Sequence, residues 1–199
     1  LAIIALIVFV TSLFTRSVDP VVPLIADGMV VQVGTAALLS TAFALPYALI
    51  QPVLGALGDM MSKTRLMSIC LAILVLSAFA SATAPNFTIL MLSRVVAGIA
   101  SGGIFPISLA TAADRVPLAN RQVVIGRLLA ATMTGNLLGA TLSGVVGDLA
   151  GWRWVFVVVG TLGLTVTIAA WIAFRTVPRE PASGFDLSAI GPNYRAIFT

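Results

Sequence analysis

The sequence predicts an all-α integral membrane protein with six transmembrane helices arranged as a 3+3 inverted repeat. Of its 199 residues, 59% are hydrophobic and only 9% are charged, and the mean hydropathy is +1.10. A soluble domain is about 45–50% apolar and about 25% charged, so this chain has too few charges to cover a surface that faces water. A membrane-spanning helix needs roughly 20 apolar residues, which leaves room for about six such helices.

Six apolar runs, separated by short polar breaks, predict a six-helix bundle over residues 1–177. The runs are too long and too continuous for the strands of a membrane barrel, which span about ten residues with strict alternation. Asn86 follows Ala84 and Pro85 in one short break, and asparagine is a preferred residue for capping the start of a helix. The predicted spans are roughly residues 2–25, 34–57, 66–83, 87–112, 123–146 and 152–174.

Basic residues predict the orientation of the bundle. Loops on one side hold eight Lys and Arg residues, whereas loops on the other side hold only Arg153. Cytoplasmic loops carry the excess of positive charge, so we expect a multi-pass protein of the plasma (inner) membrane with both termini in the cytoplasm. The net charge of +4 therefore reflects orientation in a lipid bilayer, and no nucleic-acid partner is expected. The eight residues are Lys63, Arg65, Arg115, Arg121, Arg127, Arg175, Arg179 and Arg195.

The last segment, residues 178–199, is polar and contains Pro178, Pro181 and Pro192. This composition predicts a cytoplasmic linker. Because a linker has to connect two parts, we expect it to lead toward a second half that this chain lacks.

A short motif supports the inverted repeat. Residues 55–59 and 144–148 both read Gly-x-x-Gly-Asp, 89 positions apart, at the ends of the second and fifth spans. The predicted orientation places the two copies on opposite sides of the membrane, as an inverted repeat of three plus three helices requires. Secondary transporters are built from such repeats, although small residues that pack helices together would produce the same motif.

Three charged residues lie well inside the apolar spans, away from their ends. Arg16 and Asp19 are in the first span and Arg94 is in the fourth. A charge at the centre of a membrane helix costs at least about 2.5–3.5 kcal/mol, so such residues are expected to be paired, to face water or to have a function. We predict that Asp19 and Arg94 meet across a water-filled cavity and that Asp19 carries a proton across the membrane. A static ion pair, or a position of Arg16 and Asp19 at the membrane interface, would also explain them.

Glycines recur along the fifth span at Gly126, Gly135, Gly139 and Gly144. The Gly-x-x-x-Gly spacing of Gly135 and Gly139 predicts a close approach between two helices.

The composition argues against an enzyme. The chain has no histidine, no paired carboxylates and no phosphate-binding loop, so we expect no cofactor and no metal site. Its single cysteine, Cys70, lies in an apolar stretch and is expected to be a buried hydrophobic residue.

The loop after the second span resembles a signature of the major facilitator superfamily, G-x-L-x-D-R-x-G-R-(K/R). Gly55, Leu57, Asp59 and Lys63 match it, and Arg65 adds a nearby positive charge. The resemblance implies a gating loop that holds two six-helix halves together through charge pairing. The departures are Met60 for the usual Arg and Ser62 for the usual Gly.

Three other segments resemble the same family. Residues 94–98 resemble its R-x-x-x-G pattern, whose arginine is implicated in proton transfer. The four glycines of the fifth span resemble its antiporter signature, g-x8-G-x3-G-P-x2-G-G, with Ala140 at the proline position and Ser143 at a glycine position. Residues 151–156 resemble the start of the family's sixth span.

The resemblance covers about residues 1–180 and implies the N-terminal half of a twelve-helix transporter. We then expect export of a small organic solute by alternating access, of the proton-coupled antiporter type, with protons and the solute as ligands. The expected partner is a missing C-terminal half or a second copy of the chain. The alternatives are a six-helix scaffold that does not transport, or a half-transporter that works as a homodimer.

Overall fold

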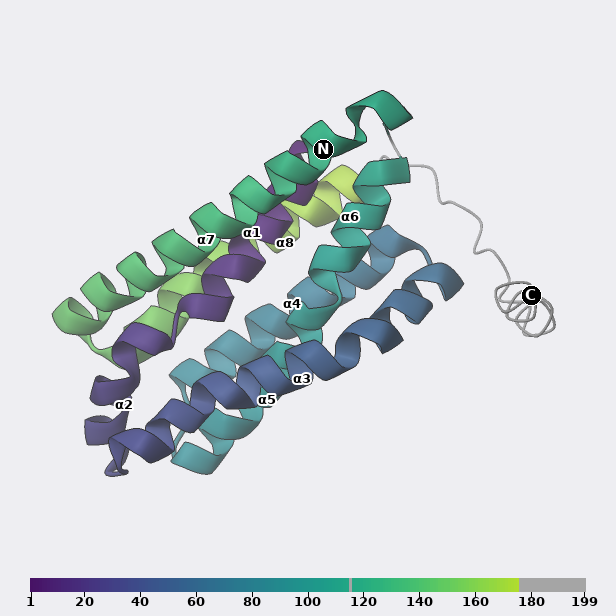
Figure 1. Ribbon diagram of the computed structural model, residues 1–199. Helices are drawn as coiled ribbons and strands as arrows, with labels where there is room; N and C mark the ends of the chain where they lie inside the picture. Colours follow the sequence, from purple (N-terminus) through teal and green to yellow (C-terminus); the bar gives the residue numbers. More distant parts are fainter. Residues whose placement is uncertain (115, 176–199) are drawn as a thin grey trace, which may run out of the picture.

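The computed structural model describes residues 1–114 and 116–175, and every regular element in this part is a helix (Figure 1). The predicted linker 178–199 and the side chains of Asp59 and Met60 lie outside the described part. The α-helices are α1 (Ala2–Arg16), α2 (Val22–Met29), α3 (Val33–Met60), α4 (Lys63–Ala82), α5 (Phe87–Gly102), α6 (Ile104–Asp114), α7 (Arg121–Ala150) and α8 (Trp152–Arg175). Short 3₁₀ turns, Asp19–Val21 and Leu118–Asn120, precede α2 and α7.

Among the described residues, six helices are long and apolar enough to cross a membrane, which confirms the predicted fold class. Two of these spans are made of two helices each, α1 with α2 and α5 with α6. The spans are Ala2–Met29, Val33–Gly58, Lys63–Ala82, Phe87–Asp114, Leu118–Ala150 and Trp152–Arg175.

The first span is interrupted after Arg16, where the sequence predicted a continuous helix over residues 2–25. Pro20 and Pro23 lack the backbone N–H that a continuous helix would use, so the ladder of hydrogen bonds cannot run through this point. The Ser17 hydroxyl donates to the Phe14 carbonyl at 2.9 Å and satisfies one of the freed acceptors. Helix resumes at α2 and continues to Met29, four residues beyond the predicted end.

The fourth span is interrupted at Gly103, again inside a predicted continuous helix. Pro106 lacks the N–H that would bond to the carbonyl of Gly102, so α5 ends there and α6 begins at Ile104. A Cβ atom added to Gly102 would lie 2.5 Å from the Tyr47 carbonyl oxygen. The interruption therefore lies where α5 is pressed against the backbone of α3.

The pairing of helices follows the predicted 3+3 repeat. Helix α1 packs along α7, and α3 packs along α5 (Figure 1). Helix α1 also contacts α8, as α5 contacts α4, while α4 and α8 pack on each other. When the first three spans are exchanged with the last three, the α1–α7 pair becomes α5–α3 and the α1–α8 pair becomes α5–α4. The α4–α8 pair maps onto itself, as the repeat requires.

Glycines make both close helix pairs possible. Added Cβ atoms on Gly135 and Gly139 of α7 would lie 2.3 and 2.5 Å from carbonyl oxygens of α1, at Phe9 and Leu13. On α5, an added Cβ at Gly98 would lie 2.2 Å from the carbonyl oxygen of Phe43. The backbones touch at these points, because no side chain separates them.

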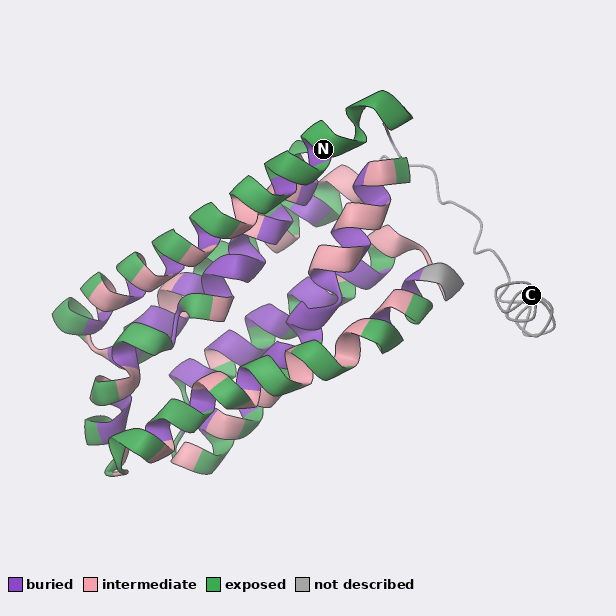
Figure 2. Ribbon diagram, viewed as in Figure 1, coloured by how far each residue is buried: buried purple, intermediate pink, exposed green. Residues whose placement is uncertain are grey.

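Burial distinguishes the helices. The core is built from α1, α4 and α5, whereas α3 and α7 carry long exposed faces (Figure 2). The exposed faces are apolar, with Leu45 and Leu49 on α3 and Met133 and Leu137 on α7. In a bilayer such faces meet lipid or another apolar helix surface.

The loop between α4 and α5 contains the predicted cap of the fourth span. The Asn86 side chain accepts a hydrogen bond from the Ile89 N–H at 2.9 Å, which confirms this prediction. Nearby, the Arg153 guanidinium donates to the Ala84 carbonyl at 2.9 Å and stacks 4.2 Å from the Trp152 ring. These contacts tie the start of α8 to the loop between α4 and α5.

Candidate functional site

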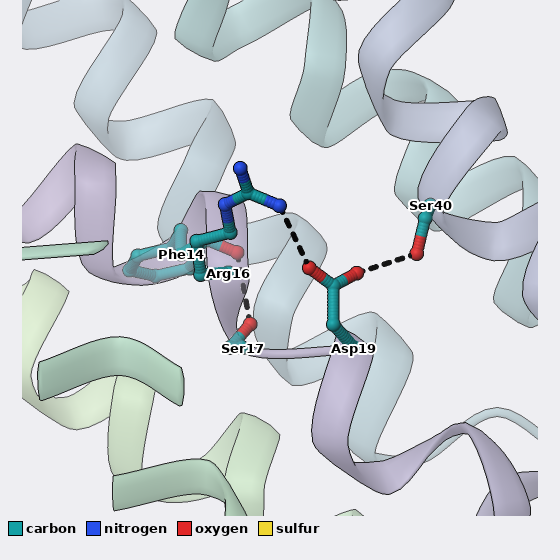
Figure 3. Close-up of polar contacts among 5 residues, drawn as sticks. All are labelled: Phe14, Arg16, Ser17, Asp19 and Ser40. Carbon is teal, nitrogen blue, oxygen red and sulfur yellow. Dashed lines mark hydrogen bonds and ion pairs between the residues drawn. The ribbon is translucent and has the colours of Figure 1, made fainter. Parts of the chain in front are cut away.

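A charged pair lies at the interruption of the first span. The Arg16 Nη1 and Asp19 Oδ2 atoms are 3.2 Å apart, and Ser40 of α3 donates to Asp19 Oδ1 at 2.7 Å (Figure 3). The two charged side chains are 58% and 40% exposed, although they lie near the middle of the span Ala2–Met29. An exposed ion pair at this depth is expected to face water or a protein partner, because lipid cannot solvate it.

The predicted first span, residues 2–25, placed this pair on one unbroken helix, and that prediction was wrong. Arg16 ends α1, whereas Asp19 begins the 3₁₀ turn after it. The side chains still meet because the turn is tight. Asp19 also reaches Ser40 on the neighbouring helix, so that the carboxylate links the first and second spans.

Arg94 lies in a different environment. It is 2% exposed, and its Nε and Nη2 atoms are buried without a hydrogen-bond partner in the described chain. The Cζ atom of its guanidinium lies 4.6 Å from the centroid of the Phe43 ring. A desolvated cation–π contact stabilises by about 2 kcal/mol or more. Burying an unpaired charge costs several kcal/mol. The ring therefore offsets only part of the cost of burying Arg94.

Asp19 and Arg94 were predicted to lie close enough to couple. In the described part of the chain, the ion pair of Asp19 is with Arg16 and not with Arg94. Of the alternatives, a static Asp19–Arg94 ion pair does not match this arrangement. The proton-carrying role of the three residues stays a prediction.

The bundle contains a cavity of about 260 Å³. Helices α1, α3, α5, α6 and α7 all contribute to its wall. Its apolar wall includes Val8, Ile104, Phe105 and Leu129, and its polar wall consists of hydroxyl groups. The hydroxyl groups belong to Thr11, Ser12, Thr15, Tyr47, Ser101 and Thr132.

Most of these hydroxyl groups already donate a hydrogen bond within the protein. Thr11, Ser12 and Ser101 each donate to the carbonyl four residues earlier in their own helix, at 2.7 to 2.8 Å. Thr15 and Thr132 do the same at 3.1 and 3.0 Å. A hydroxyl oxygen that donates in this way can still accept, so the cavity offers weak acceptors in an apolar wall and no carboxylate.

The predicted gating loop is only partly described. Lys63, at the start of α4, forms an ion pair with Asp114 at the end of α6. Gly55 is half-buried with open space around its Cα, and Arg65 is exposed on the first turn of α4. Asp59 lies in the last turn of α3, and its side chain belongs to the part outside the description. The gating role of these four residues remains a prediction.

The four glycines of the fifth span divide into two kinds. Gly135 and Gly139 touch the backbone of α1, as the Gly-x-x-x-Gly spacing predicts. Gly126 has no atom within 4 Å of an added Cβ, and Gly144 has only a Pro20 carbon at 3.7 Å. Only the middle pair is therefore needed for helix packing.

Sequence reasoning missed Phe43, Ser40 and Asp114, which contact Arg94, Asp19 and Lys63. These residues are common types in unremarkable positions, so no local pattern marks them. A signal did exist for Gly102: with Gly98 it forms a second Gly-x-x-x-Gly, which predicts a close helix approach.

Comparison with known proteins identifies the family. Residues 4–193 match the Major Facilitator Superfamily. The chain belongs to this superfamily, which places it among transporters rather than enzymes.

Two relatives illustrate the similarity. The quinolone resistance protein NorA of Staphylococcus aureus (strain Mu50 / ATCC 700699) is 29% identical over 179 residues, which cover 90% of this chain and 46% of that protein. The MFS-type transporter YfhI of Bacillus subtilis (strain 168), named as uncharacterized, is 30% identical over 140 residues, or 70% of this chain and 35% of that protein. The chain thus spans less than half the length of these relatives.

Proposed function

We propose that this chain is one half of a transporter that exports a small organic solute by alternating access, driven by protons. The observation that carries the proposal is the exposed Arg16–Asp19 pair in the middle of a membrane span. The same bundle encloses a cavity of about 260 Å³. A charged pair at that depth needs a water-filled cavity, and alternating access supplies one.

The cavity supports an amphipathic solute with apolar rings. Its wall is apolar apart from hydroxyl oxygens and the Tyr47 phenol, a pattern that suits a ligand with a few hydrogen-bond donors. The relative named for quinolone resistance makes quinolones the first solutes to test.

Asp19 is the residue best suited to carry the proton. It is a carboxylate inside a membrane span that is 40% exposed and is held by Arg16 and Ser40. Protonation would remove the ion pair with Arg16 and weaken the hydrogen bond from Ser40, since a neutral carboxyl is a poorer acceptor than a carboxylate. The charge state of Asp19 would therefore alter the contact between the first two spans.

The proposal includes the orientation and the membrane. In the described part, Lys63, Arg65, Arg121, Arg127 and Arg175 lie at one end of the bundle and Arg153 at the other. The positive-inside rule then puts the first end in the cytoplasm of a plasma (inner) membrane.

The remaining partner is a second six-helix half or a second copy of the chain. The apolar faces of α3 and α7 flank the cavity and are uncovered, which favours such a partner over a scaffold with no transport role. Because Cys70 is the only cysteine and is buried, introduced cysteines report cleanly on contacts. A Leu137→Cys chain that crosslinks to itself in membranes supports a homodimer, and one that stays a monomer of 20.6 kDa supports a separate half.

The test of transport is norfloxacin movement in liposomes that contain the protein, with a pH gradient of either sign. We expect the wild type to move the quinolone in the direction opposite to proton flow. In Asp19→Asn, quinolone movement should no longer depend on the pH gradient. Asp27→Asn is the matched control, because Asp27 is exposed at the outer end of α2. Proton-driven transport that is unchanged in Asp19→Asn would refute the role of Asp19.

A further inference from the structure

The Arg94 guanidinium makes a cation–π contact with an aromatic ring. The guanidinium Cζ lies 4.6 Å from the Phe43 centroid, and Phe43 is itself only 2% exposed. Two of the guanidinium nitrogens, Nε and Nη2, are buried and make no hydrogen bond within the described chain. A cation with two buried nitrogens that make no hydrogen bond depends strongly on the quadrupole of a ring above it.

The backbone holds this ring in place. Gly98 follows Arg94 by four residues, so both lie on the same face of α5. An added Cβ on Gly98 would lie 2.2 Å from the Phe43 carbonyl oxygen and 3.2 Å from its Cα. Helix α3 is therefore in direct backbone contact with α5 one turn beyond Arg94. A residue at this contact projects its side chain along α5, where the guanidinium lies.

A second ring connects the pair to the cavity. Phe43 and Tyr47 lie one helical turn apart on α3, and their rings stack with centroids 5.9 Å apart and planes at 19°. Tyr47 lines the cavity, and its own carbonyl touches α5 at Gly102. Arg94, Phe43 and Tyr47 thus form a continuous row from a buried charge to the cavity wall.

We propose that Phe43 is the positioning residue for Arg94: its ring holds a guanidinium that makes no ion pair in the described part of the chain, and through Tyr47 it connects that charge to the solute cavity. The proposal rests on the transport function proposed above where it concerns the solute, but the contact between ring and charge stands independently. Phe43 does not need to touch a proton or the solute to have this role.

The decisive experiment changes the ring without changing its shape. Phe43 is replaced by mono-, di- and trifluorophenylalanine through nonsense suppression, and the purified protein is treated with phenylglyoxal, which modifies arginines. Mass spectrometry then gives the modification rate at Arg94. Each fluorine weakens the quadrupole of the ring, so we expect the rate to rise stepwise, by about tenfold over the series. A rate that stays flat across the series overturns the proposal.

Ordinary variants supply the matched comparison. Phe43→Leu removes the ring and should expose Arg94 to the reagent at least as much as the trifluoro ring does, whereas Phe43→Trp should protect Arg94. Phe156→Leu is the control for loss of a buried ring elsewhere, because Phe156 packs edge-on against Trp152. Equal Arg94 reactivity in Phe43→Leu and Phe156→Leu would contradict the proposal.

Norfloxacin transport by the same fluorinated proteins tests the link to function. We expect the maximal rate of norfloxacin transport to fall with each added fluorine, while the rate of phenylglyoxal modification at Arg94 rises. If reactivity rises and transport does not change, the positioning role in transport is wrong. If the wild type moves no norfloxacin, the proposed function fails for this solute, and the modification series still decides whether Phe43 holds Arg94.

Discussion

The first and fourth spans occupy equivalent places in the 3+3 arrangement, yet they hold their arginines in opposite ways. Each span is interrupted and each carries one arginine inside the membrane. Arg16 is exposed and paired with a carboxylate, whereas Arg94 is buried under a ring. One charge is thus exposed and the other is sequestered, which shows that related helices in one bundle can meet the cost of a charge by different means.

The two spans also exchange roles in helix packing. The fourth span supplies the glycines, Gly98 and Gly102, for its contact with α3. The first span supplies carbonyl groups, and its partner α7 supplies Gly135 and Gly139. The distances from an added Cβ to the facing carbonyl oxygen are nearly the same in both helix pairs. A close backbone approach is therefore common to both pairs, whereas the helix that supplies the glycines differs.

The largest effect is expected from a side chain at these contacts. Gly98→Val and Gly139→Val should each destabilise the bundle by about 3 kcal/mol or more, because a Cβ would lie within 2.5 Å of a backbone oxygen that cannot move aside. Unfolding in detergent by a mild denaturant measures the loss.

Gly126→Val is the control for these variants, because an added Cβ there meets nothing within 4 Å. A loss at Gly126 comparable to that at Gly98 would show that the glycines act through something other than helix contact.

Neutral replacement of the two arginines should separate their roles. Arg94→Met should lower transport about a hundredfold or more while raising stability by about 1 kcal/mol, because it removes a buried charge that lacks a carboxylate partner. Arg16→Met should change stability by less than about 1 kcal/mol, because its pair is exposed. Transport rates and unfolding midpoints of both variants provide the measurement. If Arg94→Met unfolds more easily than Arg16→Met, the picture of an uncompensated charge at Arg94 is wrong.

A smaller effect is expected from the hydroxyl that holds Asp19. Ser40→Ala removes the 2.7 Å hydrogen bond to Asp19 Oδ1, and we expect transport to fall by about threefold to tenfold. Thr41→Ala, at the next residue on the exposed side of α3, serves as the control. Equal rates in Ser40→Ala and the wild type would mean that Asp19 works without its contact to α3.

The smallest effect concerns the start of the fourth span. Asn86→Ala removes the side-chain acceptor for the Ile89 N–H and should cost about 1 kcal/mol of stability with no change in transport. Asn86→Asp and Asn86→Ser should restore most of the loss, since both can cap a helix. If the capping variants were no better than alanine, the asparagine would have another role.

The residues differ in how far the sequence predicted them. Asn86 was recognised as a cap because capping depends on the next three residues alone. The helix interruptions at Arg16 and Gly103 were missed, although Pro20, Pro23 and Pro106 are visible, because a proline in a membrane helix produces a kink, a break or no change depending on its neighbours.

The partners of the charges could not be predicted. Asp19 was expected to couple with Arg94, and its direct contacts proved to be Arg16 and Ser40. Ser40 lies on a different helix, 21 positions away, and only the packing of α2 against α3, next to the turn that holds Asp19, selects it. The same holds for Phe43, which contacts Arg94 because Gly98 brings α3 and α5 together.

The sequence by itself determined the class of the protein, its six spans and the three charges inside the membrane, because hydrophobic length and the cost of a buried charge act locally. Only the tertiary structure decided which glycines touch a backbone, which helices surround the cavity and which arginine meets a carboxylate. Those outcomes depend on contacts between helices that are distant in sequence, and hydropathy does not encode such contacts.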